Sequence, residues 1–126
     1  MREQILELLT ALGVTGADSD PLLDLVIQSV TDTIKNGTNQ DVIPVGLESA
    51  AVYNAVGQYM KFKKNVGQLT GFDLEGAVKQ IQEGDTNVVF AVGEGDMTPE
   101  GRLESLISWL TVYGKDQYYR YRRLLW

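Results

Sequence analysis

Apolar residues in the first half of the chain recur at the three- and four-residue spacing of an α-helix, and this spacing constrains the fold more than any other feature. The first such stretch, Arg2 to Leu12, is followed by Gly13, a residue that typically ends a helix. Before the second stretch, Asp20 can accept a capping hydrogen bond, and Pro21 suits the first helical position. We expect this second helix to end at Asn36-Gly37.

The third stretch, from Pro44 to about Lys64, differs from the others because it is rich in small residues. Small side chains let neighbouring helices approach closely, so we expect this helix to be the central and most buried one. Lysines in its last turn favour the negative end of the helix dipole, which gives them a structural role. The small residues are Ala50, Ala51, Ala55 and Gly57, and the lysines are Lys61, Lys63 and Lys64.

The periodicity changes between residues 77 and 92, where apolar and other residues alternate as they do in a half-exposed strand. The turn-forming residues Glu83-Gly84-Asp85 interrupt this segment, so we predict a β-hairpin over residues 77–92 with its tip at Gly84-Asp85. An isolated hairpin is marginally stable in water. We therefore expect it to pack on the helices or on a neighbouring subunit.

A last helix is predicted from Thr98-Pro99-Glu100, which is a typical helix start, to Gly114. Residues 115–126 then form an aromatic-basic tail, Lys-Asp-Gln-Tyr-Tyr-Arg-Tyr-Arg-Arg-Leu-Leu-Trp. Tyrosine, tryptophan and arginine dominate binding hot spots, so the tail either docks into a partner protein or packs back on its own core. Interleaved aromatic and basic residues also hold single-stranded nucleic acid, although the net charge of −6 opposes binding to phosphate.

Together these segments predict a single, mainly α domain over residues 1–126, a small helical bundle of about four helices with one inserted β-hairpin. Its parts are a helical region (1–64), the hairpin (77–92), a helix (98–114) and the tail (115–126). We find no secretory signal and no stretch of about 20 apolar residues, and so expect no membrane partner.

The chain contains neither cysteine nor histidine, which removes the thiolate nucleophile, the commonest general base near neutral pH and the commonest metal ligand. No phosphate-binding glycine loop, dinucleotide fingerprint or nucleophile motif is present. Asp18, Asp20 and Asp24 do not match the spacing of a calcium loop, and helix capping explains them more simply. We therefore expect a protein without catalysis, cofactor or metal.

Three segments resemble the head–tail connector (adaptor) proteins of long-tailed phages and prophages of Gram-positive bacteria. They are Phe72-Asp73-Leu74-Glu75, residues 78–88 (Val-Lys-Gln-Ile-Gln-Glu-Gly-Asp-Thr-Asn-Val) and Tyr121-Arg122-Arg123 with Trp126. The extended run Tyr118-Tyr119-Arg120-Tyr121 departs from that pattern. The resemblance covers the whole chain and is clearest over residues 44–126.

The resemblance implies a structural subunit of a ring, dodecameric in the virion, that sits beneath the portal protein and extends the DNA channel. It also implies a downstream head-completion protein as partner, DNA that passes without sequence-specific binding, and assembly in the host cytoplasm. The alternatives are another phage tail-completion or packaging accessory protein, and a small nucleic-acid-binding regulator. By the same resemblance, the candidate portal contacts are Tyr118, Tyr119, Arg120, Tyr121, Arg122, Arg123 and Trp126, and the candidate ring contacts are Val78, Ile81, Gly84, Asp85, Val88 and Phe90.

Overall fold

The computed structural model describes residues 1–67 and 99–123. Over these ranges the chain is helical and contains no strand, so the prediction of a mainly α fold is confirmed. The predicted hairpin at residues 77–92 lies outside the described residues. The elements are α1 (Arg2–Ala11), α2 (Pro21–Thr38), the 3-10 helix η1 (Val45–Leu47), α3 (Glu48–Asn65), α6 (Pro99–Val112), the 3-10 helix η2 (Lys115–Gln117) and the one-turn α7 (Tyr118–Tyr121).

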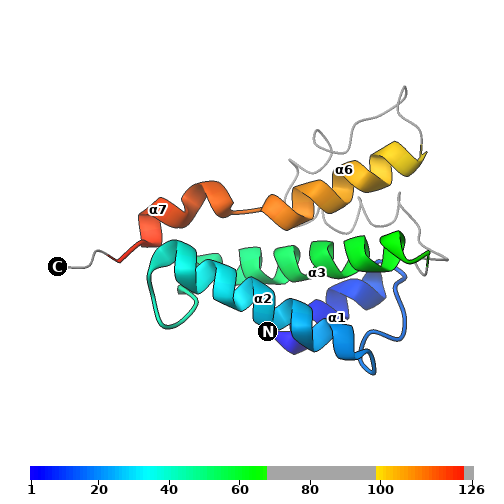
Figure 1. Cartoon of the computed structure of the whole chain (residues 1–126), viewed down its shortest axis with the longest axis horizontal. Helices are drawn as coiled ribbons and strands as arrows, with labels where there is room; N and C mark the ends of the chain where they lie inside the picture. Colours follow the sequence, from blue (N-terminus) through cyan, green and yellow to red (C-terminus); the bar gives the residue numbers. More distant parts are fainter. Residues whose placement is uncertain (68–98, 124–126) are drawn as a thin grey trace.

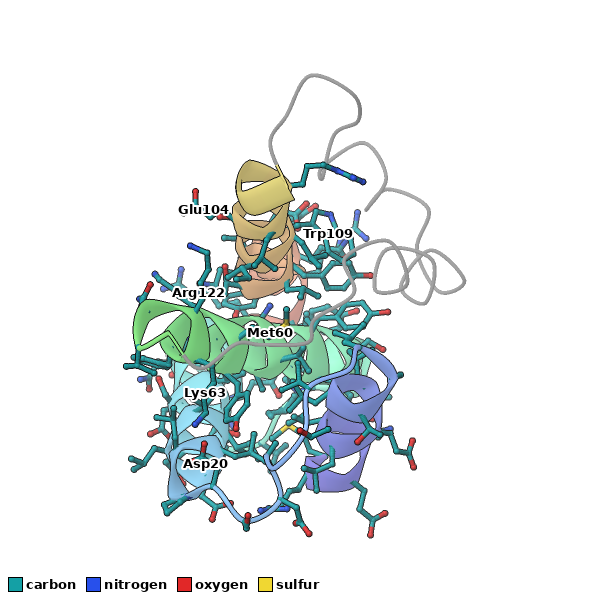
Figure 2. All side chains as sticks on the ribbon, turned by 90° about the vertical axis from the view of Figure 1, so that its right-hand side faces the viewer. Asp20, Met60, Lys63, Glu104, Trp109 and Arg122 are labelled. Carbon is teal, nitrogen blue, oxygen red and sulfur yellow. The ribbon has the colours of Figure 1, made fainter. Side chains whose placement is uncertain are left out.

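Helix α3 lies at the centre of the domain, with α6 on one side and α1 and α2 on the other (Figures 1 and 2). Its small residues are buried as the sequence predicts, and its larger ones, Tyr59 and Met60, are at most 1% exposed. The other helices each supply one apolar face to this core. The fully buried side chains of those faces are Ile5, Leu9, Leu12, Leu23, Val26, Ile34, Leu106 and Leu110.

Helix α2 begins as the sequence predicts but ends later. The Asp20 carboxylate accepts a hydrogen bond from the backbone N–H of Leu22 at 3.0 Å, and Pro21 occupies the first turn. The predicted end at Asn36-Gly37 is wrong, because the helix continues through Thr38 and closes on Asn39 in the left-handed conformation (φ 53°). The glycine that resembles a stop signal is instead a position of close packing inside the helix.

The contact between α3 and α6 depends on two residues of α3. A Cβ atom at Gly57 would lie 2.7 Å from the Cβ atom of Leu110 and 2.9 Å from the backbone N of Thr111, so only glycine fits here. Asn54, which is 2% exposed, donates hydrogen bonds to the carbonyl oxygens of Leu110 (2.7 Å) and Tyr113 (3.0 Å). These carbonyls lie at the end of α6, where they have no partner within the helix. Asn54 therefore caps α6 from the side.

The substitution Gly57→Ala should destabilise the domain although alanine is the better helix former. Helix propensity favours alanine by about 1 kcal/mol, whereas overpacking a tight contact costs about 1–3 kcal/mol. We expect a net loss of about 1 kcal/mol in the free energy of unfolding, measured by urea denaturation. Lys61→Ala, at an exposed position of the same helix, is the control. A variant more stable than wild type would contradict the close contact of α3 with α6.

Candidate assembly interface

The aromatic-basic tail begins at one end of the domain, where η2 and α7 continue the chain beyond α6 (Figure 1). Helix α7 turns towards α2 and packs on its C-terminal end. Two tail tyrosines lie directly on glycines. A Cβ atom at Gly37 would be 2.5 Å from the Cδ2 atom of Tyr118, and one at Gly46 would overlap the phenol of Tyr121. We call Gly37 and Gly46 the glycine seats.

The contact with Tyr118 explains why α2 contains a glycine, Gly37, in its last turn. An interior helical glycine costs about 1 kcal/mol relative to alanine, so Gly37 weakens α2 on its own. The missing side chain leaves room for the ring of Tyr118. Burial of this ring raises the pKa of the Tyr118 phenol. The Tyr118 hydroxyl is buried and makes no hydrogen bond to any described residue. Packing of the ring, and no polar contact, therefore holds this tyrosine.

Hydrogen bonds fasten the tail just beyond the seats. The backbone N–H of Arg123 donates to the carbonyl oxygen of Thr38 at 2.8 Å, in the last turn of α2. The side-chain amide of Asn39 donates to the carbonyl oxygen of Arg123, also at 2.8 Å, and that of Gln40 donates to the carbonyl oxygen of Tyr121. Residues 121–123 thus satisfy polar groups at the end of α2 that the helix leaves unpaired.

The tail residues therefore divide into two sets. Tyr118 and Tyr121 are half-buried on the domain, which is the packing that the sequence left open as one of two interpretations. The other described candidate portal contacts, Tyr119, Arg120, Arg122 and Arg123, are exposed. The portal contact of both sets stays a prediction. Trp126 and the predicted ring contacts Val78, Ile81, Gly84, Asp85, Val88 and Phe90 lie outside the described residues.

Sequence reasoning missed the glycine seats. The pattern at Asn36-Gly37 predicts a helix end, and no local pattern distinguishes Gly46. A glycine within an apolar helical pattern can mark close packing as well as a helix end, and this was the available signal.

The acids near the start of α2 are engaged in ion pairs. Asp20 pairs with Lys63 and accepts a hydrogen bond from the Tyr59 hydroxyl at 2.9 Å (Figure 2). Asp18 and Asp24 both contact the Arg2 guanidinium, at 2.8 and 3.2 Å. No group of three or more potential metal ligands occurs within residues 1–67 and 99–123. The prediction that Asp20 caps α2 is confirmed, whereas Asp18 and Asp24 serve Arg2.

Contacts at the Asp20 carboxylate shift the pKa values of Asp20 and Tyr59. The Lys63 ammonium, the Leu22 backbone N–H and the Tyr59 hydroxyl all stabilise the ionised carboxylate, which lowers the pKa of Asp20 from 3.8 to about 2. Burial, and then the neighbouring Asp20 carboxylate, raise the pKa of Tyr59 to about 12. Since Asp20 precedes α2 and Lys63 ends α3, this network fixes the two helices to each other.

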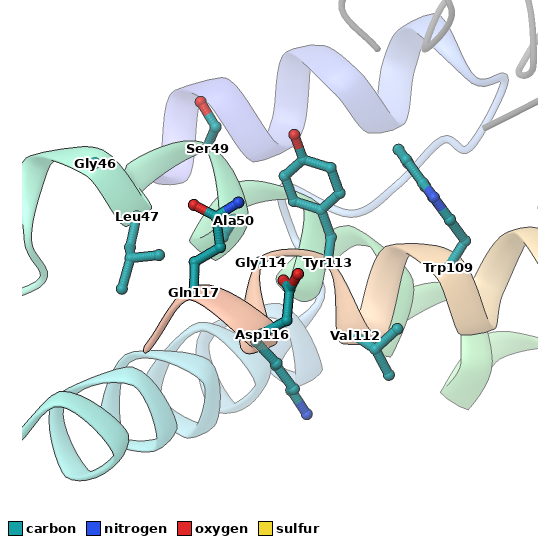
Figure 3. Close-up of a pocket in the computed structure, with 11 residues that line it drawn as sticks. Gly46, Leu47, Ser49, Ala50, Trp109, Val112, Tyr113, Gly114, Asp116 and Gln117 are labelled. Atoms are coloured by element: carbon teal, nitrogen blue, oxygen red, sulfur yellow. The ribbon is translucent and has the colours of Figure 1, made fainter. Parts of the chain in front are cut away.

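A groove of about 720 Å³ lies where the start of α3 faces the end of α6 (Figure 3). The rings of Tyr53, Trp109 and Tyr113 contact one another beside it in tilted and edge-to-face arrangements, with ring centroids 4.8–5.9 Å apart. Asp116 is the one acid among the described residues that line the groove, so no pair of carboxylates is available for acid–base chemistry there. The lining residues are Gly46, Leu47, Ser49, Ala50, Trp109, Val112, Tyr113, Gly114, Lys115, Asp116 and Gln117.

The fold and the exposed end of the domain together indicate a class of protein. The described residues form a small helical domain with exposed charged and aromatic groups at one end, which is typical of a structural protein that acts through contacts. Within these residues no helix is long and apolar enough to cross a membrane.

The model of the phage gp6-like head-tail connector protein family matches residues 3–88, more than half of the chain. The chain therefore belongs to this family of structural phage proteins. No curated protein and no solved structure matches it significantly. The match confirms the resemblance to head–tail connectors over residues 3–88 and the expectation of a connector role, whereas Tyr121-Arg122-Arg123 and Trp126, which also carried the resemblance, lie outside the matched residues.

The Asp20 network makes stability depend on pH in the acid range. Because the pKa of Asp20 is lower in the folded than in the unfolded chain, its contribution is present above about pH 4 and is lost as the pH falls through about 2. Asp20→Asn keeps a capping side chain but removes the charge. We expect its stability deficit, measured by urea denaturation, to be constant from pH 7 to 5 and to shrink towards pH 2. Glu7→Gln, on an exposed part of α1, is the control; a deficit for Asp20→Asn that does not change with pH would contradict the network.

Proposed function

We propose that the chain is one subunit of a dodecameric ring that binds beneath the portal of a long-tailed phage or prophage of a Gram-positive bacterium. The ring prolongs the DNA channel and carries the next head-completion protein. It assembles in the host cytoplasm and remains at the head–tail junction of the virion. Family membership supports the connector role, and the ring, its size and its contacts are what the proposal adds.

The observation that carries the portal contact is the exposure of the charged tail residues. Tyr119 is 70% exposed, and Arg120, Arg122 and Arg123 are exposed beside it. These residues lie at the end of the domain, beyond the packed part of α6 (Figure 1). Arginine and tyrosine at an accessible end supply hot-spot residues without cost to the core.

The net charge supports passage of DNA without adhesion. With 17 acids against 11 bases, the subunit carries −6. A phosphate backbone binds to clustered lysine and arginine, and an acidic subunit opposes such binding. A ring of such subunits is therefore suited to line or border a channel through which DNA slides.

The portal contact is tested by truncation after Tyr121, which removes residues 122–126, and with them the two hydrogen bonds of Arg123 to Thr38 and Asn39, but keeps both seated tyrosines in the chain. We expect at least about tenfold weaker binding to the purified portal, because two arginines of the exposed set are lost. Binding is measured by mass photometry, and folding is checked by circular dichroism. Lys61→Glu changes an exposed charge at the opposite end of α3 and serves as the control. Unchanged affinity of the truncated chain would contradict the tail as portal contact.

The ring contact is tested at the predicted hairpin, whose residues carry that assignment by resemblance. Phe90→Asp or Val88→Asp places a charge on the apolar set of residues 77–92, so we expect loss of rings on the portal in negative-stain images. Asn87→Asp, at the alternate position of the same segment, is the control. If Val88→Asp and Phe90→Asp alter neither ring formation nor the free energy of unfolding, the hairpin is not a ring contact.

A further inference from the structure

The structure points to a tail that binds as a preformed element. We propose that Tyr118 and Tyr121 stay in the glycine seats when the portal is bound, and that Tyr119, Arg120 and Arg122 contact a carboxylate-rich surface of the partner. This inference rests on the proposed portal contact, and it specifies which side of the tail is used and what chemistry it meets.

The rings of Tyr118 and Tyr121 cannot occupy the glycine seats and insert into the portal at the same time. The ring of Tyr118 fills the space that the missing side chain of Gly37 leaves, and the phenol of Tyr121 fills the space at Gly46. A tail that inserted these rings into the portal would have to leave both seats. It would also break the three hydrogen bonds that residues 121–123 share with Thr38, Asn39 and Gln40.

Tyr119 and Arg120, two of the exposed tail residues, already hold each other in position. The Arg120 Nε atom donates to the Tyr119 hydroxyl at 3.2 Å, and its guanidinium carbon lies 5.8 Å from the centre of that ring. Arg122 makes no hydrogen bond or ion pair with any described residue and has extended backbone. Side chains held in place lose less freedom when they bind, which favours recognition by Tyr119 and Arg120, whereas Arg122 contributes an exposed guanidinium beside them.

The exposed arginines indicate the chemistry of the partner surface. Arginine presents a planar fork of N–H donors that matches a carboxylate, and stacking on tyrosine leaves that fork accessible. Arg123 is set apart from the other two, because its guanidinium lies 4.0 Å from the Asp41 carboxylate of the same chain and its backbone is bound to α2. Two arginines beside one tyrosine therefore favour an acidic protein surface.

A covalent lock separates a seated tail from a released one. The side chains of Asp41 and Arg123 are adjacent and exposed, and the chain contains no cysteine, so Asp41→Cys with Arg123→Cys can be joined by a short bis-maleimide without competing thiols. We expect the locked protein to bind the portal within about threefold of the same double variant before crosslinking. Binding that falls more than tenfold on crosslinking would overturn the inference, because it would show that the tail must leave the seats.

Matched substitutions test the two sides of the tail. Arg120→Glu and Arg122→Glu should each weaken portal binding about tenfold or more, since each puts a negative charge against carboxylates. Tyr118→Phe keeps the seated ring and removes a hydroxyl that is buried without a partner, so binding should be retained. Loss of binding in Tyr118→Phe, or unchanged binding in both arginine variants, would contradict the assignment.

The seats themselves offer a third comparison. Gly37→Ala should displace Tyr118 and weaken binding, whereas Asn36→Ala, at the exposed neighbouring position of α2, should not. Equal affinity for Gly37→Ala and wild type, with the fold intact by circular dichroism, would speak against a role for the seat. A wild-type chain that fails to bind the portal at all would instead overturn the proposed function, and the inference with it.

Discussion

The structure depends on the burial of α3 on both sides. A central helix can touch three others only if its side chains are small where the contacts are close, and Gly57 and Asn54 show what this demands. Gly57 lets the backbone of α6 approach, and Asn54 satisfies carbonyls that this approach would otherwise leave buried without a partner. Because α1 and α2 contact α3 more than each other, their positions follow from α3 as well.

Close packing on a glycine also determines how the tail lies at the far end of the domain. Helix α6 packs on one side of α3 and α2 on the other, and the segment from η2 to Arg123 joins them around the start of α3 (Figure 1). Here too a missing side chain, at Gly37, sets the distance. The tail is thus part of the fold on one side and surface on the other, although it is only a few residues long.

The helices could be predicted from the sequence because their apolar periodicity and caps are local signals. Asp20 and Pro21 predicted the correct start of α2, and the small residues predicted the correct central helix. The stretch expected to be helical from Pro44 begins instead as the 3-10 helix η1, and α3 itself starts at Glu48. The end of α2 was missed because Gly37 has the same local pattern whether it stops a helix or receives a ring from residue 118, which is a contact across most of the chain. The pairing of Asp20 with Lys63 was missed for the same reason, since the lysine is explained equally well by the helix dipole alone.

The division within the tail follows from what each residue type contributes to folding. Tyrosine rings gain stability from packing against backbone, so Tyr118 and Tyr121 belong to the domain wherever a glycine gives them room. Exposed arginines gain little from pairing on their own surface, and Arg120 and Arg122 form no ion pair with the described residues. Their substitution therefore costs the fold little, and under the proposed portal contact it is the partner that constrains them. A segment this short can both pack on the domain and carry the proposed portal contact only through different side chains. Tyr118 and Tyr121 supply the packing, and Tyr119, Arg120 and Arg122 remain for the proposed contact.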